Sequence, residues 1–267
     1  MPAGISQQRK GEAFRALHTA SPFVIPNPWD AGSAKVFAAL GFEALATTSA
    51  GFAFTLGRLD GDVTLDEVVE HIRALDAATS LPVSVDLENG YGPDPADAAR
   101  AISRAAEAGA VGGSIEDYDP AAGIYAIDHA TERVAAACEA ARSLDFPFTL
   151  TARAENYVRD NPDLDDTIAR LQAYERVGAD VLYAPRLPGA EEIRAIRSAT
   201  SRPLNVLTGP GLSVNEIIEA GGQRISVGGR LTWVAINAMA AAAQELHNGA
   251  DLPSSADPAQ ITGWLST

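Results

Sequence analysis

The sequence predicts a TIM-type (βα)8 barrel, an α/β fold in which eight parallel strands alternate with helices. Eight short apolar or β-branched runs alternate with longer alanine-rich helical patterns along the 267 residues. Three similar phrases, E-A-G-A-V, E-R-V-G-A-D-V and E-A-G-G-Q-R-I, each join a helix end and a glycine turn to the next run. No G-x-G-x-x-G motif follows an early run, which disfavours the alternative of an open doubly wound sheet.

The expected strands cover residues 23–26, 43–49, 82–88, 111–117, 148–155, 179–185, 203–208 and 224–228. Helical patterns fill the gaps, and the one that precedes residue 179 ends at Gly178, a suitable helix C-cap. No linker divides the chain, so we expect a single barrel domain over residues 1–267. The tail from about residue 249 is rich in proline and serine before a short apolar end. It should either pack on a neighbouring subunit or fray.

The composition is that of a globular protein with a large negative charge. Hydrophobic residues make up 46% of the chain, and the formal net charge is −15, which disfavours nucleic acid and anionic membranes as partners. No apolar run reaches the roughly 18 residues of a membrane span, and the N-terminus lacks the apolar core of a signal peptide. We therefore expect a soluble, cytoplasmic protein. The single cysteine, Cys138, lies in a helical pattern and is interpreted as a core residue rather than a nucleophile.

Polar residues cluster at the ends of the expected strands, where barrels of this type place their catalytic side chains. These residues are Asn27, Trp29, Asp30, Thr47, Thr48, Ser49, Asp86, Glu88, Glu116, Asp117, Arg153, Glu155 and Asn205. Asp86 and Glu88 are two residues apart, so in a strand both would point to one face. At least three carboxylates are therefore expected at one mouth of the barrel.

Converging carboxylates repel one another unless a cation offsets their charge. An all-oxygen ligand set without His or Cys suits Mg²⁺, or Mn²⁺ in its place. The alternative is that these acids pair with arginines or cap helices. Arg153 is the only cation at the ends of the central strands, which favours the metal.

Other chemistries find less support. The only two lysines, Lys10 and Lys35, do not lie at strand ends, which disfavours a Schiff-base aldolase. The four histidines form no pair with metal spacing, and no G-x-S-x-G motif is present, which disfavours zinc and serine hydrolases. Glycine turns at 208–211 and 227–230 follow the last two strands, where barrels often bind phosphate, but a lone glycine turn is weak evidence and ordinary turns are the favoured interpretation.

The motifs, taken in order, resemble those of the isocitrate lyase and phosphoenolpyruvate mutase superfamily. The similarity runs from P-N-P-W-D-A-G-S-A to V-G-G-R and includes T-T-S-A-G-F, V-D-L-E-N-G-Y-G, S-I-E-D, T-A-R-A-E and P-L-N-V. With the D-G that follows Arg58 and Leu59, these are six pieces in the right order on the right strands, which makes the resemblance specific. It implies a barrel whose eighth helix is exchanged with a partner, usually within a homotetramer arranged as a dimer of dimers.

The resemblance also implies the roles of individual residues. It implies that Mg²⁺ is bound by Asp86, Glu88 and Glu116, partly through water, with Asp60 nearby. It implies that the turn of Ser49, Ala50 and Gly51 binds a substrate carboxylate. We assign Arg153, Asp60 and Glu116 to catalysis, and Trp29, Ser49, Ala50, Gly51, Arg153 and Asn205 to substrate binding.

The sequence departs from the family in the loop after the fourth strand. The isocitrate and methylisocitrate lyases carry Lys-Lys-Cys-Gly-His there, and the mutase carries a lysine and an asparagine that grip the phosphoryl group. Here the loop reads D-Y-D-P-A-A-G-I-Y-A-I-D-H, with none of these residues. The end of the sixth strand, A-P-R-L-P, also lacks the glutamate of the lyases. Tyr118, Tyr125 and His129 are the candidate proton donors, each with a structural role as the alternative.

These observations predict a Mg²⁺-dependent carbon–carbon lyase or decarboxylase. Its substrate would be a small 2-oxo or 2-hydroxy carboxylic acid, and the reaction would pass through the enolate of a 2-oxo acid. One alternative is a carbon–phosphorus enzyme such as a phosphonopyruvate hydrolase or mutase. A second alternative is a barrel that binds a metabolite without turning it over.

Overall fold

A computed structural model describes residues 5–251 and 257–266. Eight parallel strands form one sheet in the order β1-β10-β9-β8-β7-β4-β3-β2. The strands are β1 (Phe23–Ile25), β2 (Leu45–Ala46), β3 (Val83–Asp86), β4 (Gly112–Glu116), β7 (Thr149–Arg153), β8 (Val181–Tyr183), β9 (Leu204–Leu207) and β10 (Arg224–Ser226). Each lies inside one of the eight expected ranges, so the predicted α/β barrel is confirmed, with strands shorter than expected.

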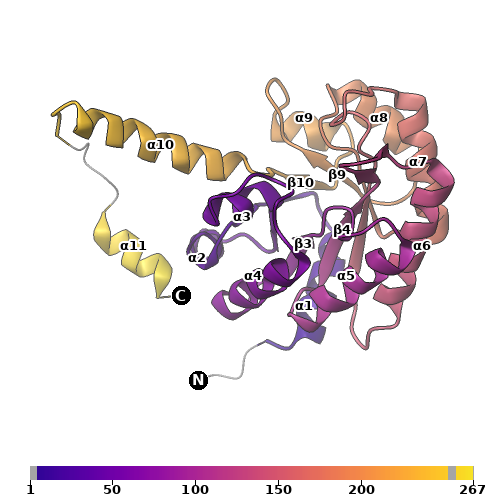
Figure 1. Ribbon diagram of the computed structural model, residues 1–267, viewed down its shortest axis with the longest axis horizontal. Coiled ribbons are helices and arrows are strands. Elements are labelled where there is room, and N and C mark those ends of the chain that lie inside the picture. Colours follow the sequence, from indigo (N-terminus) through magenta and orange to yellow (C-terminus); the bar gives the residue numbers. More distant parts are fainter. Residues whose placement is uncertain (1–4, 252–256, 267) are drawn as a thin grey trace.

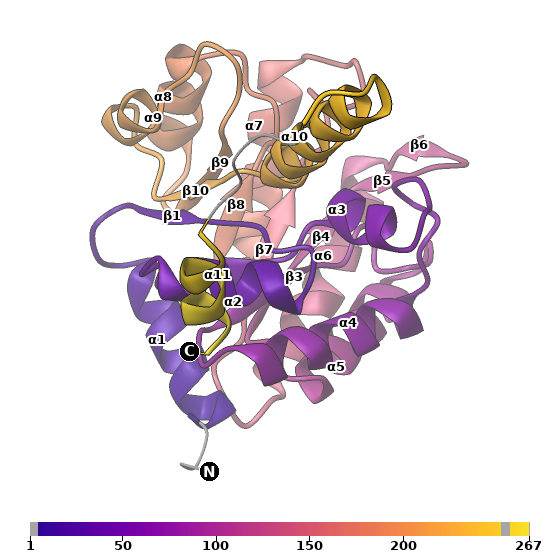
Figure 2. The same cartoon turned by 90° about the vertical axis from the view of Figure 1, so that its left-hand side faces the viewer.

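Most of the helices lie around the outer face of this sheet (Figures 1 and 2). The helices of the described residues are α1 (Gln7–Leu17), α2 (Ala31–Ala39), α3 (Ser49–Thr55), α4 (Leu65–Ala78), α5 (Pro95–Glu107), α6 (Ile127–Arg142), α7 (Leu164–Val177), α8 (Ala190–Ala199), α9 (Val214–Glu219), α10 (Arg230–His247) and α11 (Pro258–Leu265). A small hairpin, β5 (Tyr118–Asp119) with β6 (Gly123–Ile124), was not predicted. It occupies the loop in which the sequence departs from the family.

Local sequence explains where the helices begin and end. In α4, Thr64 and Glu67 form a capping box, in which each side chain accepts from the other residue's backbone N–H. Helix α7 ends at Gly178 with φ of 109°, the left-handed conformation that glycine adopts without strain, as the sequence predicts. Between the helices and the sheet, small and branched side chains form the main hydrophobic core, and Cys138 is buried within it, as predicted.

Asn27 joins the two ends of the sheet. The Ala46 N–H donates to the Pro26 carbonyl at 3.1 Å, which links β2 to the end of β1. The Asn27 side chain donates to the Thr47 carbonyl at 3.0 Å and accepts from the N–H groups of Val227 and Gly228, both at 2.9 Å. A single buried amide thus ties β1, β2 and the turn after β10 together at the mouth of the barrel.

Helix α1 packs against the opposite end of the barrel, where the strands begin. Phe14 is fully buried and clusters with Phe23 and Val111, which lie at or just before the starts of β1 and β4. A Cβ on Gly112 would lie 2.7 Å from the Phe14 ring, so only glycine allows this approach. Since this end is covered, the side chains at the carboxyl ends of the strands face the accessible mouth.

Helix α10 leaves the barrel and projects from it (Figure 1). Of its residues only Thr232 is buried, while Trp233, Val234, Met239 and Leu246 are exposed. In the predicted tail, 258–265 form α11, which packs against α2, and residues 252–256 and 267 lie outside the described part of the chain. No helix within the described ranges is long and apolar enough to cross a membrane.

Candidate active site

Arg153, the last residue of β7, gathers the carboxylates at the mouth. Its guanidinium lies 3.1 Å from Asp86 Oδ1, 3.0 Å from Glu116 Oε2 and 2.8 Å from Glu155 Oε1. Burial disfavours the charged form, but the three carboxylates outweigh burial and hold the pKa of Arg153 well above its usual value. The alternative in which these acids pair with an arginine therefore holds for Asp86 and Glu116 in this structure.

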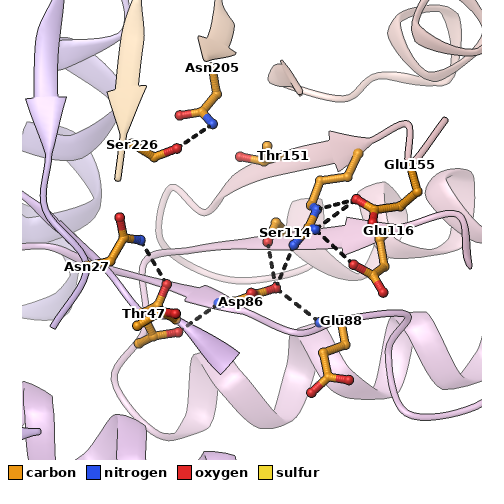
Figure 3. Close-up of polar contacts among 12 residues, drawn as sticks. Asn27, Thr47, Asp86, Glu88, Ser114, Glu116, Thr151, Glu155, Asn205 and Ser226 are labelled. Carbon is orange, nitrogen blue, oxygen red and sulfur yellow. Dashed lines mark hydrogen bonds and ion pairs between the residues drawn. The ribbon is translucent and has the colours of Figure 1, made fainter. Parts of the chain in front are cut away.

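Asp86 is the last residue of β3 and is held by several neighbours (Figure 3). Its Oδ1 accepts from Arg153, from the Ser114 hydroxyl at 3.4 Å and from the Glu88 N–H at 3.3 Å. Its own N–H donates to the Thr47 hydroxyl at 2.9 Å. The neighbouring strands β2, β4 and β7 therefore fix the position of this carboxylate.

The expectation that Asp86 and Glu88 share one face of a strand is wrong. The strand ends at Asp86, and Glu88 has a φ of 47°, in the left-handed region. Alternation of side chains applies only within the strand, so a turn rather than the strand sets the direction of Glu88. In Figure 3 its carboxylate points away from Asp86. Both residues still lie at the mouth, but on different cavities.

Among the described residues, no cation forms an ion pair with the Glu88 carboxylate. Its Oε1 is buried and has no hydrogen-bond partner. Burial, followed by the charges of Asp86 and Asp60, raises the pKa of Glu88 to about 7. This oxygen is therefore available to a further ligand.

Glu116 is the last residue of β4 and Asp117 follows it, and their side chains lie on opposite sides. Glu116 faces Arg153 in the mouth, and burial raises its pKa well above the usual value although Arg153 opposes the shift. Asp117 accepts from the Tyr174 hydroxyl at 2.6 Å and pairs with Arg170 at 3.1 Å, behind the strand. Glu116 thus belongs to the site, and Asp117 anchors the helix layer.

Two cavities meet at Arg153. The inner cavity, of about 70 Å³, lies on the barrel axis and is lined by residues from all eight barrel strands, among them Asp86, Tyr183 and Asn205. The outer cavity, of about 360 Å³, opens above it and is lined by Ser49, Asp60, Glu88, Glu116, Tyr118, Glu155 and Arg159, among others. Arg153 lines both. A small acid could thus contact Arg153 from either side.

The structure brings three of the six predicted substrate residues, Ser49, Arg153 and Asn205, to these cavities. Asn205 lines the inner cavity, where it donates to Ser226 Oγ at 3.0 Å and accepts from Arg224 at 2.8 Å. Ser49 and the exposed Asp60 line the outer cavity. The Asn205 amide is held by its neighbours, which fixes its orientation toward the cavity.

Three predicted residues line neither cavity. Trp29 packs edge to face against Phe37, with the ring centroids 6.3 Å apart, at the border of a hydrophobic cluster. Ala50 and Gly51 lie in the first turn of α3, and the Gly51 N–H donates to the Thr48 hydroxyl at 3.3 Å. The predicted carboxylate-binding turn is therefore the start of a short helix, and one of its N–H groups is already used.

Of the three candidate proton donors, only Tyr118 lines the outer cavity. Tyr125 is buried, shares hydrogen bonds with Asn89 and Asp119, and stacks under Arg133 at 4.7 Å. His129 contacts the Pro93 carbonyl at 2.9 Å. The structural alternative thus describes Tyr125 and His129. The turn at 227–230 is also an ordinary one, since Asn27 takes two of its N–H groups.

Sequence reasoning missed Tyr183 and Arg159. Tyr183 ends β8, and its ring lies 5.3 Å from the Arg153 guanidinium carbon. Its place at a strand end was the available signal. Arg159 lies in the loop after β7 and reaches Glu116 and Glu155, both at 3.5 Å. No periodicity predicts where a loop side chain points, so nothing in the sequence marked it.

The donor set of the mouth suits a hard divalent cation. In the described part of the chain, the acids that line the two cavities outnumber the three arginines there, Arg153, Arg159 and Arg224, which leaves an excess of negative charge. These acids include Asp60, Asp86, Glu88, Glu116 and Glu155. In the described ranges, no three acidic, histidine or cysteine side chains are already gathered as a metal-binding group. The unpartnered Glu88 oxygen and the all-oxygen set fit Mg²⁺ or Mn²⁺ by their chemistry.

The fold and the site together define an α/β-barrel enzyme whose mouth combines acidic oxygens with arginine. The family model of phosphoenolpyruvate phosphomutase matches residues 14–247. The chain therefore belongs to that family, within the isocitrate lyase and phosphoenolpyruvate mutase superfamily, which confirms the resemblance and the prediction of a lyase-type enzyme.

Individual relatives agree with this membership. An uncharacterized protein of Mycobacterium tuberculosis H37Rv is 31% identical, over 93% of each chain. A 2-methylisocitrate lyase of Escherichia coli K12 is 30% identical over 75% of this chain and 70% of its own length. An oxaloacetate decarboxylase of Rhodopseudomonas palustris is 29% identical over 81% and 76%. A solved Burkholderia cenocepacia J2315 structure with a provisional lyase/mutase name is 51% identical over 98% and 97%, with a TM-score of 0.94.

Proposed function

We propose that the protein is a Mg²⁺-dependent lyase or decarboxylase that breaks a carbon–carbon bond in a small 2-oxo or 2-hydroxy carboxylic acid. The observation that carries the proposal is the arrangement of Arg153 among Asp86, Glu116 and Glu155 at the junction of two cavities. The relatives named 2-methylisocitrate lyase and oxaloacetate decarboxylase support it.

Breaking such a bond leaves negative charge on the oxygen of a 2-oxo acid. Mg²⁺ or Mn²⁺, held by Asp86, Glu88 and Glu116, would neutralise that charge and polarise the adjacent bond. Arg153 is already fixed by three carboxylates, so it can stabilise the same charge without reorganising. The Asn205 amide faces the substrate from the inner cavity, and Ser49 and Asp60 face it from the outer one.

Decarboxylation makes the smallest demand on the loop after β4. That loop lacks the cysteine and lysines of the isocitrate lyases, and only Tyr118 of the candidate donors lines the outer cavity. A decarboxylase needs only a proton for the resulting enolate, which Tyr118 or solvent can deliver. This favours decarboxylation over cleavage reactions that require a strong loop acid.

The experiment is a turnover assay with purified protein and Mg²⁺ on a panel of small 2-oxo and 2-hydroxy acids. We expect release of a 2-oxo acid such as pyruvate or glyoxylate, or of CO₂, from at least one of them. Activity should disappear with EDTA, return with Mg²⁺ or Mn²⁺, and fall at least about 100-fold in Asp86→Asn. The matched control is Asp128→Asn, which removes a charge from an exposed position in α6. Absence of turnover with every acid and metal would refute the proposal.

A carbon–phosphorus enzyme remains the second candidate, favoured by the match to the phosphomutase family model. Release of phosphate from phosphonopyruvate, with little pyruvate from oxaloacetate, would establish it. We also retain the predictions of a cytoplasmic homo-oligomer with an exchanged helix. The non-catalytic barrel is no longer favoured, because the chain belongs to a family of enzymes.

A further inference from the structure

The loop after β7 is folded so that one arginine stands at the rim of the outer cavity. The N–H groups of Val158 and Arg159 donate to the Glu155 carbonyl at 3.0 and 3.1 Å, and the Asn161 N–H donates to the Asn156 carbonyl at 3.0 Å. Asp160 adopts a left-handed φ of 55°, which closes the turn. The position of Arg159 is therefore set by a compact, internally bonded turn.

The Arg159 guanidinium stacks on an aromatic ring and forms only long contacts with carboxylates. Its central carbon lies 3.5 Å from the centroid of the Tyr118 ring, a close stacking contact from the β5–β6 hairpin. Its contacts with Glu116 Oε1 and Glu155 Oε2 are both 3.5 Å, longer than the roughly 2.7–2.9 Å of a strong charge-assisted hydrogen bond. Arg153 takes the other oxygen of each carboxylate at 3.0 and 2.8 Å. Arg159 therefore keeps donors for another anion.

The two arginines differ in what they can offer a substrate. Arg153 is largely enclosed and its charge is shared among three carboxylates, whereas Arg159 is 33% exposed on the open side. Among the described residues that line the outer cavity, these two are the only cations. A substrate with one acidic group can bind at the enclosed centre. A second acidic group, directed outward past Glu88 and Glu116, would need Arg159 to offset repulsion.

We propose that Arg159, positioned by Tyr118, binds the second acidic group of the substrate and so selects diacids over 2-oxo monoacids. The inference deepens the proposed function and rests on it for the reaction, but not for the binding. A carboxylate and a phosphonate share the chemistry that a guanidinium recognises, since both accept paired N–H donors. The expected substrate class is therefore a 2-oxo or 2-hydroxy acid with a second anionic group two or three carbons away.

The test compares Arg159→Gln with the wild type in the presence of Mg²⁺. Titration calorimetry measures binding of pyruvate, a 2-oxo monoacid, of oxalate, a two-carbon diacid that has no distal acidic group, of a four-carbon dicarboxylate and of phosphonopyruvate. We expect binding of the preferred diacid to weaken about 10- to 100-fold, the effect of losing a charged hydrogen-bonded pair, with less than about 3-fold change for oxalate. Where turnover is measurable, KM should rise by a similar factor and kcat should change little. Arg176→Gln, on the exposed face of α7, is the charge-matched control.

Tyr118 gives a second, independent variant pair for binding alone. Tyr118→Phe keeps the ring under Arg159 and should retain diacid affinity, whereas Tyr118→Ala should lose it as Arg159→Gln does.

Equal weakening of oxalate and diacid would mean that Arg159 only adjusts the acidic cluster, and the inference would be overturned. It would also fail if the wild type bound diacids no better than monoacids. A binding difference without any turnover would refute the proposed reaction but leave the role of Arg159 intact. The ligand that loses affinity in Arg159→Gln, the dicarboxylate or phosphonopyruvate, identifies the chemistry of the distal group.

Discussion

At the scale of single residues, Glu88 carries the largest uncompensated cost. It combines a left-handed backbone, a buried oxygen without a partner and two carboxylate neighbours that repel it. Such a residue destabilises the metal-free fold, because a buried charge needs a partner. Functional sites are where proteins tolerate such costs. The same oxygen is what a bound cation requires.

Glu88→Gln tests both roles of this carboxylate, its cost to the metal-free fold and its contribution to cation binding. Removal of the charge should leave the metal-free protein at least as stable as the wild type. The increase in melting temperature that Mg²⁺ gives the wild type should shrink or disappear, because ligand-induced stabilisation scales with affinity. Thermal unfolding with and without Mg²⁺ measures both effects. A less stable variant that still responds fully to Mg²⁺ would contradict this role.

His71, which lines neither of the two cavities, provides a pH-dependent contribution to stability. It is buried, stacked on Phe52 at 3.9 Å, and its Nε2 has no partner. Burial lowers the pKa of His71 from 6.5 to about 4. Between these values the unfolded chain binds a proton that the folded chain excludes, so stability falls as the pH falls through this window.

His71→Phe should remove this dependence while it preserves the stacked ring. Between pH 7 and pH 5 the wild type should lose about 2 kcal/mol more unfolding free energy than the variant. Denaturant unfolding at both pH values measures the difference. Parallel losses in the two proteins would show that His71 is protonated in the folded state at pH 5.

At the scale of elements, the joint between β1, β2 and β10 depends on one side chain. Asn27 supplies three hydrogen bonds to backbone groups, and it is 5% exposed. The strands it joins are only two or three residues long. Strands this short form few backbone hydrogen bonds with one another. The Asn27 amide therefore contributes part of the bonding that closes the barrel.

Asn27→Ala should therefore cost about 3 kcal/mol of unfolding free energy, because the partly buried N–H groups of Val227 and Gly228 lose their acceptor and the Thr47 carbonyl loses its donor. Chemical denaturation measures this loss. The control Asn248→Ala removes an exposed amide at the end of α10 and should change stability by less than about 0.5 kcal/mol. A loss of the same small size at Asn27 would mean that water replaces the amide and that the joint is weaker than the contacts indicate.

At the scale of the whole molecule, α10 presents an apolar surface that its own barrel does not cover. The N-terminal part of α10 contacts α3, where Trp233 meets Phe54 with ring centroids 6.0 Å apart. Val234 and Met239 are 64% and 61% exposed. Exposed apolar patches of this kind mark association surfaces. The predicted exchange of the eighth helix within a homotetramer would bury this surface.

Val234→Asp combined with Met239→Asp should lower the molar mass of the assembly, since burying two charges at an apolar interface is costly. Light scattering coupled to size exclusion measures the mass. The control Gln244→Asp adds a charge at a polar position on the same helix and should leave the mass unchanged. A monomeric wild type, or a double variant of unchanged mass, would refute the predicted assembly.

The sequence by itself determined the barrel and most of the residues at its mouth. Alternating apolar runs, glycine turns and caps are local signals, and the carboxyl ends of parallel strands must meet at one face, so Asp86, Glu116, Arg153 and Asn205 could be placed together. Only the tertiary structure decided where strand periodicity stops. Glu88 leaves the strand in a left-handed turn, Trp29 packs into a hydrophobic cluster, and Arg159 reaches the cavity from a loop. These outcomes depend on contacts between distant segments, which no pattern along the chain encodes.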